Sequence, residues 1–223
     1  MSNQYYKWVT RAYDDPCGLA RALNLVGDRW ALLIVRELLL GPKRFTQLRR
    51  GLPGASQSML TARLAELEEA QVVRRRRLGP PASTWAYELT EWGRELQPAL
   101  VPLARWGSRS PLTSSAELSV DALALALTTT FDPAAAGDLE VRCQLRLDGD
   151  TLLLTIYDGK MDVTRADASD ADMVIETSAV GLRALTFGGA SLDAVDATIQ
   201  GDRETVARLL RLFKRPTPIT TLD

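Results

Sequence analysis

Residues 45–89 read FTQLRRGLPGASQSMLTARLAELEEAQVVRRRRLGPPASTWAYEL, and this stretch decides the expected fold of the first half of the chain. Its opening, Phe45–Arg50, predicts a short helix, and Gly51–Gly54 predicts a tight turn. Ser56 is a favourable N-cap for a second helix at Gln57–Ala70. Leucines give that helix one apolar stripe, and its opposite face is small and polar: Ser58, Thr61, Ala62 and Ala65. This order indicates a helix-turn-helix, because a small polar helix face fits the major groove of DNA.

The segment that follows predicts a β-hairpin. Two strand-like runs, Val72–Leu78 and Thr84–Leu89, flank a Gly79–Pro81 loop. The first run contains four consecutive arginines, Arg74–Arg77, a pattern that suits contact between a wing and DNA phosphates. The alternative interpretation is a solvated charge run. Its position directly after a helix-turn-helix favours phosphate contact.

Three further helices are expected around this motif. The first, Cys17–Val26, has an apolar face of Leu19, Leu23 and Val26. The second, Arg29–Leu40, is apolar over most of its circumference, so we expect it to be the buried centre, with Asp28 as its N-cap. The third runs from Glu91 to about Trp106, with Thr90 as its N-cap.

Charge divides the chain of 223 residues into two halves. Residues 1–109 contain 17 Lys and Arg against 10 Asp and Glu, whereas residues 110–223 contain 10 against 18. A basic and an acidic half indicate two domains with different partners, because only the basic one attracts phosphate. We therefore expect domains at 1–109 and 116–214, a linker at 110–115 and a flexible tail at 215–223.

Composition excludes several classes of protein. The chain has no run of 18 apolar residues that would span a membrane, and Met1–Thr10 lacks the layout of a signal peptide. Its two cysteines, Cys17 and Cys143, fit a reducing compartment, so a cytoplasmic location without membrane association is expected. The chain contains no histidine, which removes Ser-His-Asp and Cys-His catalytic sites and the commonest zinc ligand. We therefore expect that the protein is not an enzyme and that it has no cofactor and no metal site.

An ordered series of motifs resembles the HxlR-type winged-helix regulators between about Pro16 and Trp106. The series is Cys17, 25–30 (LVGDRW), 41–45 (GPKRF), 52–60 (LPGASQSML), 64–68 (LAELE) and 87–93 (YELTEWG). Cys17 is followed by Gly18, where the family usually has Pro. Family members also often end near the midpoint of this chain.

This resemblance implies a homodimer on an inverted-repeat operator in double-stranded DNA. The recognition helix would be Gln57–Ala70 and the wing would include Arg74–Thr84, with dimer contacts near Tyr5–Tyr13 and Glu91–Trp106. From the motif and the resemblance together we expect DNA contacts from Lys43, Arg44, Thr46, Ser56, Gln57, Ser58, Thr61, Ala62, Arg63, Arg75, Arg76 and Arg77.

The second half is predicted to be α+β. Alternating residues predict strands at Val141–Leu147, Thr151–Tyr157, Lys160–Thr164, Asp172–Thr177 and Ala197–Gln200. Helices are expected at Val120–Thr130, Ser178–Phe187 and Arg203–Phe213. The fold class is thus α+β, with a mainly α winged helix-turn-helix followed by a domain with a curved, mainly antiparallel sheet.

The order of these elements between about Leu118 and Phe213 resembles the sterol carrier protein fold. The resemblance implies an apolar cavity for a small hydrophobic or lipid-like effector, lined by Leu154, Ile156, Met173, Ile175, Leu182, Leu185 and Phe187. The effector would change operator affinity by stabilising one arrangement of the two domains. The alternative is that these residues simply fill a core.

Two further hypotheses involve Cys17 and the helical half. Cys17 lies at the start of a predicted helix, where the helix dipole lowers a thiol pKa, and resembling regulators sometimes use such a cysteine as an oxidant sensor. The alternative is a small buried residue, and Cys143 is expected in the core. The last hypothesis is a hydrophobic-ligand carrier with a helical interaction module, which would not need Arg74–Arg77.

Overall fold

The computed structural model describes residues 12–80, 83–111, 114 and 116–219, and divides into two compact units, Met1–Leu100 and Val101–Asp223. The division falls inside a helix, whereas the sequence places the boundary at 110–115. The reason is that this helix begins at Gln97 and its Leu100 packs into the core of the first unit. Residues 112, 113 and 115 of the expected linker lie outside the described residues.

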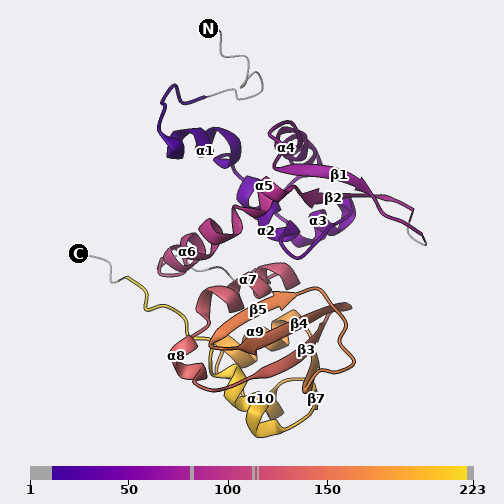
Figure 1. Ribbon diagram of the computed structural model, residues 1–223, viewed down its shortest axis with the longest axis vertical. Coiled ribbons are helices and arrows are strands. Elements are labelled where there is room, and N and C mark those ends of the chain that lie inside the picture. Colours follow the sequence, from indigo (N-terminus) through magenta and orange to yellow (C-terminus); the bar gives the residue numbers. More distant parts are fainter. Residues whose placement is uncertain (1–11, 81–82, 112–113, 115, 220–223) are drawn as a thin grey trace. The chain divides into compact units, whose positions relative to one another are not determined.

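The first unit is mainly helical with one hairpin (Figure 1). Its elements, of which the last continues past Leu100, are α1 Gly18–Val26, α2 Ala31–Leu38, α3 Phe45–Gly51, α4 Gln57–Glu69, β1 Val73–Arg77, β2 Trp85–Leu89, α5 Glu91–Arg94 and α6 Gln97–Gly107. The helix-turn-helix and the hairpin predicted from the sequence are confirmed. The expected single helix Glu91–Trp106 is wrong, since it is two helices. Pro98 has no N–H to bond the Arg94 carbonyl, which explains the break.

The core of this unit is centred on α2 and α4. Leu60, Leu64 and Leu67 of α4 are buried as predicted, and they pack in one cluster with Ile34 and Leu38 of α2. A fully packed apolar core of this kind is the main source of stability in a small unit.

The start of α2 differs from the prediction. Its N-cap is Trp30, which has a φ of 80° in the left-handed region, and Asp28 does not cap it. The Asp28 carboxylate pairs instead with Arg63 of α4. The tertiary ion pair therefore replaces the local capping bond that the sequence favours.

Helix α1 also differs from the prediction, in the face that it buries. Leu19 and Leu23, expected to face the core, are 68% and 43% exposed, while Ala20 and Val26 are buried. The buried side also contains Asn24, whose side-chain amide exchanges hydrogen bonds of 2.8 and 3.0 Å with the backbone of Tyr13. Periodicity identified an apolar face, but only tertiary packing decides which face meets the core.

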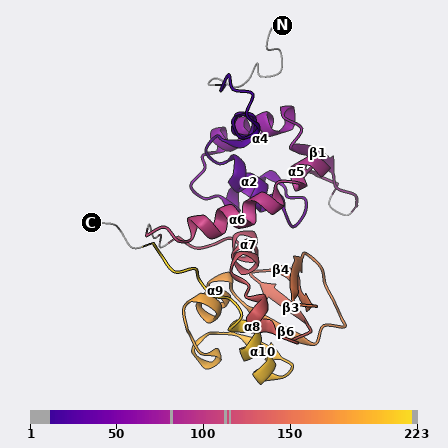
Figure 2. The ribbon, with the colours of Figure 1, turned by 60° about the vertical axis from the view of Figure 1, so that its left-hand side comes forward.

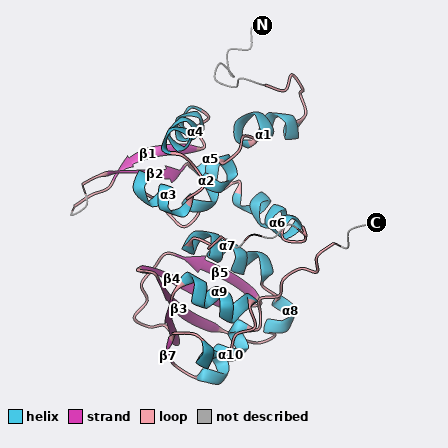
Figure 3. Cartoon of the chain, turned by 180° about the vertical axis from the view of Figure 1, so that it is seen from behind, coloured by secondary structure: helices cyan, strands magenta, loops and turns pink. Residues whose placement is uncertain are grey.

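The second unit is one sheet with helices packed against it (Figures 2 and 3). Its elements are α7 Val120–Thr130, α8 Pro133–Ala136, β3 Val141–Leu147, β4 Asp150–Tyr157, β5 Lys160–Thr164, β6 Met173–Thr177, α9 Ala179–Phe187, the 3₁₀ helix Leu192–Ala194, β7 Thr198–Gln200 and α10 Arg203–Leu210. The strand order is β5-β4-β3-β6-β7, and β3 pairs β6 in parallel while the other pairs are antiparallel. The predicted mainly antiparallel sheet is confirmed, and the parallel pairing of β3 with β6 was not predicted. The short α8 and the 3₁₀ helix were not predicted.

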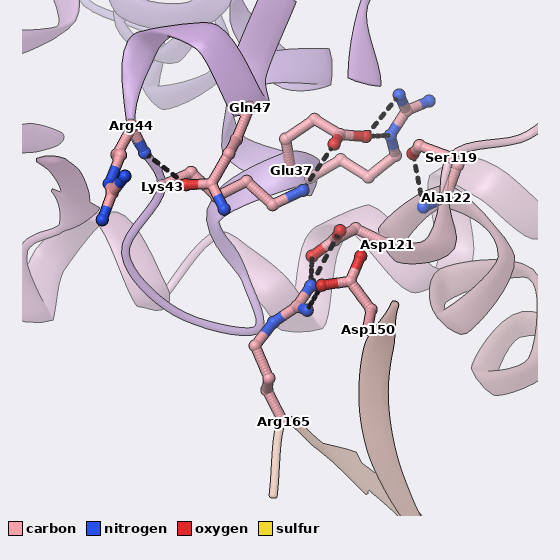
Figure 4. Close-up of polar contacts among 10 residues, drawn as sticks. Glu37, Lys43, Arg44, Gln47, Ser119, Asp121, Ala122, Asp150 and Arg165 are labelled. Carbon is pink, nitrogen blue, oxygen red and sulfur yellow. Dashed lines mark hydrogen bonds and ion pairs between the residues drawn. The ribbon is translucent and has the colours of Figure 1, made fainter. Parts of the chain in front are cut away.

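An ion cluster attaches α7 to the sheet of this unit. Asp121, buried in α7, lies 3.1 Å from the Arg165 guanidinium, which also pairs with Asp150 of β4 (Figure 4). Since a buried carboxylate is stable only when it is paired, Arg165 fixes the start of α7 over the strands.

The segment expected to be a flexible tail has contacts as far as residue 219. The Ile219 N–H donates to the Arg109 carbonyl at 2.9 Å, and the Arg215 guanidinium lies 5.5 Å from the centroid of the Phe187 ring. These contacts tie residues 215–219 to the second unit. Residues 220–223 of the expected tail lie outside the described residues.

Candidate nucleic-acid interface

The exposed face of α4 is made of small and polar side chains. Ser58, Thr61 and Ala62 are exposed, opposite the buried leucines. Ser56 caps the helix by accepting a 3.3 Å hydrogen bond from the Met59 N–H, as predicted. The Thr61 hydroxyl donates to the Gln57 carbonyl at 2.9 Å, which leaves its methyl group and lone pairs for an outside partner. This face combines hydrogen-bonding groups with little bulk, as a helix in a groove requires.

Exposed basic residues of α3 lie close to this helix. Arg44 and Thr46 are exposed at its start, where the Arg44 N–H donates to Gln47 Oε1 at 2.8 Å (Figure 4). Arg49 and Arg50 are exposed at its end, and one Arg49 Nη donates to Gln57 Oε1 at 3.3 Å. The two arginines at the end of α3 were missed from the sequence, although a basic pair directly before the turn was a usable signal.

Lys43 is not brought to this surface. Its Nζ lies 2.7 Å from Oε2 of Glu37, a carboxylate with no exposed surface that also pairs with Arg36 at 2.9 Å (Figure 4). Its backbone pairs with Tyr87 beside the hairpin. Lys43 therefore neutralises a buried anion, and the expectation that it contacts DNA does not match its place in the fold.

Arg63 is also engaged within the unit. Its guanidinium lies between Asp28 and Glu66, and forms an ion pair with each. Burial, the largest effect, raises the pKa of Glu66 although the Arg63 charge opposes it. The Nε of Arg63 is buried and has no hydrogen-bond partner among the described residues. This side chain joins the α1–α2 corner to α4 and does not extend outward.

The hairpin places the four arginines on two faces. The register puts Arg74 opposite Glu88 and Arg75 opposite Tyr87. Arg74 and Arg76 both pair with Glu88, at 2.7 and 3.2 Å. Arg75 hydrogen-bonds the Tyr87 hydroxyl at 2.9 Å and lies 3.5 Å from Glu68. Arg77 is exposed and has no ion-pair partner within the described residues.

The comparisons with known proteins match this part of the chain. The sequence model described as HxlR-like helix-turn-helix matches residues 25–113. An HTH-type transcriptional regulator of Synechocystis sp., sll1512, is 35% identical over 107 residues, which is 45% of this chain and 79% of that protein. The HTH-type transcriptional regulator YodB of Bacillus subtilis is 39% identical over 88 residues, or 40% of this chain and 79% of YodB. The chain belongs to the HxlR-like helix-turn-helix family.

The solved structure of the redox regulator HypR in its oxidized form is 32% identical to this HxlR-like protein. The match covers 44% of this chain and all of that one, with a TM-score of 0.40. The family match itself ends at residue 113, before the sheet of the second unit begins.

Cys17 of this HxlR-like protein is exposed and occupies the N-cap position of α1. Hydrogen bonds from the backbone N–H groups of Leu19 and Ala20 lower the pKa of its thiol. Burial, with a smaller effect of the Asp172 charge, raises the pKa of Cys143 to about 12. Only the first thiol combines access to solvent with a stabilised thiolate, the form that reacts. The expected core position of Cys143 is confirmed.

The seven residues expected to line an apolar cavity are packed in the second unit of the HxlR-like protein. All but Phe187 are buried: Leu154, Ile156, Met173, Ile175, Leu182 and Leu185. A cavity of about 580 Å³ lies elsewhere, and its walls are polar, including Arg146, Asp148 and Glu176. The six buried residues thus have the arrangement of a filled core.

The described residues contain no group of three or more Cys, Asp or Glu side chains arranged to hold a metal ion. A search of the same residues finds no helix of the length and apolarity needed to cross a membrane.

Proposed function

We propose that this protein is a transcriptional regulator that binds an inverted-repeat operator in double-stranded DNA as a homodimer. The observation that carries the proposal is the small polar face of α4 beside exposed arginines, in a chain of the HxlR-like family. Helix α4 enters the major groove, and the hairpin contacts the phosphate backbone as a wing.

The proposed contacts divide into two kinds. Gln57, Ser58, Thr61 and Ala62 face the base edges, where hydrogen bonds and methyl contacts discriminate sequence. Phosphate contacts come from exposed groups that carry no strong internal ion pair: Arg44, Thr46, Arg49, Arg50 and Arg77. Such contacts position the protein and make its affinity depend on salt.

The dimer part of the proposal is supported by exposed apolar residues on helices. Helix α1 exposes Leu19 and Leu23, and α6 exposes Leu103 and Trp106. Apolar side chains on exposed helix faces are typical of subunit contacts, and a second copy of the chain is the proposed occupant. Residues 1–11, which include most of the expected Tyr5–Tyr13 contact, lie outside the described residues.

The test is a fluorescence anisotropy titration of the full chain against its own upstream DNA, with a scrambled duplex as the control. Tight, selective and salt-dependent binding supports the proposal. If the folded protein binds neither duplex at low salt, with and without reductant, the regulator proposal is overturned and the carrier hypothesis takes its place.

Redox sensing through Cys17 is a second candidate function on the same scaffold. It is favoured by the exposure of this thiol and its lowered pKa, and a similar protein, HypR, is described as a redox regulator. Oxidant should then change operator binding of the wild type and leave Cys17→Ser unchanged. An equal oxidant response in both proteins would overturn this candidate.

Effector control through the second unit is the remaining part of the proposal, and it rests on the resemblance to the sterol carrier fold. A small apolar effector would have to displace core side chains, such as Leu154 and Ile175, which fill the expected cavity. Native mass spectrometry of the freshly purified protein tests this part. A retained lipid-like mass supports it, and the bare chain mass from several preparations contradicts it.

A further inference from the structure

Glu88 is a buried carboxylate in the middle of the wing. It lies on β2 and only 2% of its surface is exposed. Its two oxygens bind two different arginines, since Oε1 lies 2.7 Å from Arg74 Nε and Oε2 lies 3.2 Å from an Nη of Arg76. Both partners come from the neighbouring strand, where residues two apart share one face.

This carboxylate is ionised under ordinary conditions. Burial alone would raise the pKa of Glu88, but the hydrogen bonds and charges of Arg74 and Arg76 outweigh burial and lower it. The buried anion needs these partners, because an unpaired carboxylate in an apolar surrounding is strongly disfavoured. The three groups together therefore carry one net positive charge.

The two arginines nevertheless reach solvent. Their side chains are 61% and 58% exposed, so a phosphate can approach either of them. Any phosphate that does so competes with a carboxylate already in place. Arg77, further along the same strand, is exposed without such a competitor among the described residues.

We propose that Glu88 is a positioning residue that holds Arg74 and Arg76 on the hairpin and weakens their attraction to DNA phosphates. The inference rests on the proposed DNA-binding function. This arrangement favours specific binding. The wing keeps its shape, but its sequence-independent affinity for DNA is reduced, because that affinity grows with each phosphate neutralised. Arg77 then supplies the main phosphate contact of β1.

The test is the salt dependence of binding for Glu88→Gln, measured on the operator and on a scrambled duplex. Gln keeps the shape and a hydrogen-bonding oxygen but removes the charge. The slope of log K against log salt is expected to steepen by about one to two, at about 0.9 per phosphate gained. Affinity for the scrambled duplex should rise more than affinity for the operator.

Two further variants separate this role from a structural one. Adding Arg74→Ala and Arg76→Ala to Glu88→Gln should return the slope to about its wild-type value. Glu68→Gln, beside Arg75 at 3.5 Å, is the matched control and should steepen the slope less, because Glu68 is more exposed than Glu88. A thermal melt of each variant checks that it is folded.

The outcomes are distinguishable. If the wild type binds the operator but Glu88→Gln shows an unchanged or shallower salt slope, the inference is overturned and the regulator proposal stands. If Glu88→Gln does not fold, the single variants R74A and R76A, each of which leaves Glu88 one arginine partner, decide in its place: a loss of slope of about one in either folded variant overturns the inference, and a smaller loss supports it. Wild-type protein that binds no DNA overturns both proposals.

Discussion

At the scale of single residues, the charge of an arginine does not establish that it is available to a ligand. Arg63, Arg74 and Arg76 lie in segments that the sequence identifies with DNA contact, yet each pairs with a carboxylate of its own unit. Lys43 is itself buried and neutralises the buried carboxylate of Glu37. Residues that share a charge therefore divide into those that stabilise the unit and those that remain open to phosphate.

Arg63 and Arg77 should behave in opposite ways when replaced with alanine. Arg63→Ala removes the partner of Asp28 and Glu66, and should lower the free energy of unfolding by about 1 kcal/mol, since both carboxylates keep some exposure. Its salt slope should change little. Arg77→Ala should leave urea unfolding unchanged and flatten the slope by about one. The reverse pattern would contradict the division of roles.

The two cysteines should differ in reactivity. The lowered pKa of Cys17 provides more thiolate near neutral pH, whereas Cys143 is buried with a pKa of about 12. Iodoacetamide should label the native protein once, at a rate that increases with pH, and peptide mass mapping should place the label on Cys17. Cys17→Ser is the control and should stay unlabelled until it is unfolded.

At the scale of elements, register and orientation carry information that composition lacks. The hairpin shows this, because antiparallel pairing of β1 with β2 brings Glu88 opposite Arg74 and Tyr87 opposite Arg75. Helix α1 shows the same point, since Leu19 and Leu23 face outward while Asn24 is buried. The hairpin and α1 formed where they were predicted, but the role of their residues depends on the neighbour that each side chain meets.

The wing should lose stability in acid. The folded-state pKa of Glu88 lies below its usual value, so its ion pairs stabilise the folded protein above that usual value and are lost as pH falls through the lowered folded-state pKa. The melting temperature of the wild type should fall between about pH 6 and pH 3, and the fall should be smaller in Glu88→Gln. Parallel curves for the two proteins would contradict this assignment.

The outward leucines of α1, Leu19 and Leu23, should be needed for the proposed dimer. The double variant L19E/L23E introduces two charges on the exposed face, and sedimentation equilibrium should give a monomer mass where the wild type gives a dimer. Arg21→Gln, an exposed polar change on the same helix, is the matched control and should remain dimeric. A dimeric L19E/L23E would place the subunit contact elsewhere.

At the scale of the whole molecule, the chain consists of two compact units. The family match lies over the first of them and the start of the second, while the sheet has its own core and its own ion cluster around Asp121. The acidic composition of the second half, 18 Asp and Glu against 10 Lys and Arg over residues 110–223, does not suit phosphate contact. The proposed DNA contacts are therefore assigned to the basic unit.

The two units should respond separately to mutation. Asp121→Ala removes a carboxylate that is 3% exposed and leaves Arg165 with Asp150, and the loss of these charged hydrogen bonds should cost about 1.5–3 kcal/mol. Far-UV circular dichroism, to which the sheet and the helices of the second unit contribute, should detect this loss. Tryptophan fluorescence should change less, because four of the five tryptophans precede residue 101. Equal shifts in both signals would indicate that the units unfold together.

The sequence by itself determined the helix-turn-helix and the hairpin of the first unit and the order of strands along the second, because periodicity, caps and turn residues act locally. Only the tertiary structure decided that Leu19 faces outward, that Arg63 lies between two carboxylates and that Glu88 engages two arginines. These outcomes depend on which distant residue each side chain meets. A buried charge must find its partner across the fold, and no local pattern specifies that partner.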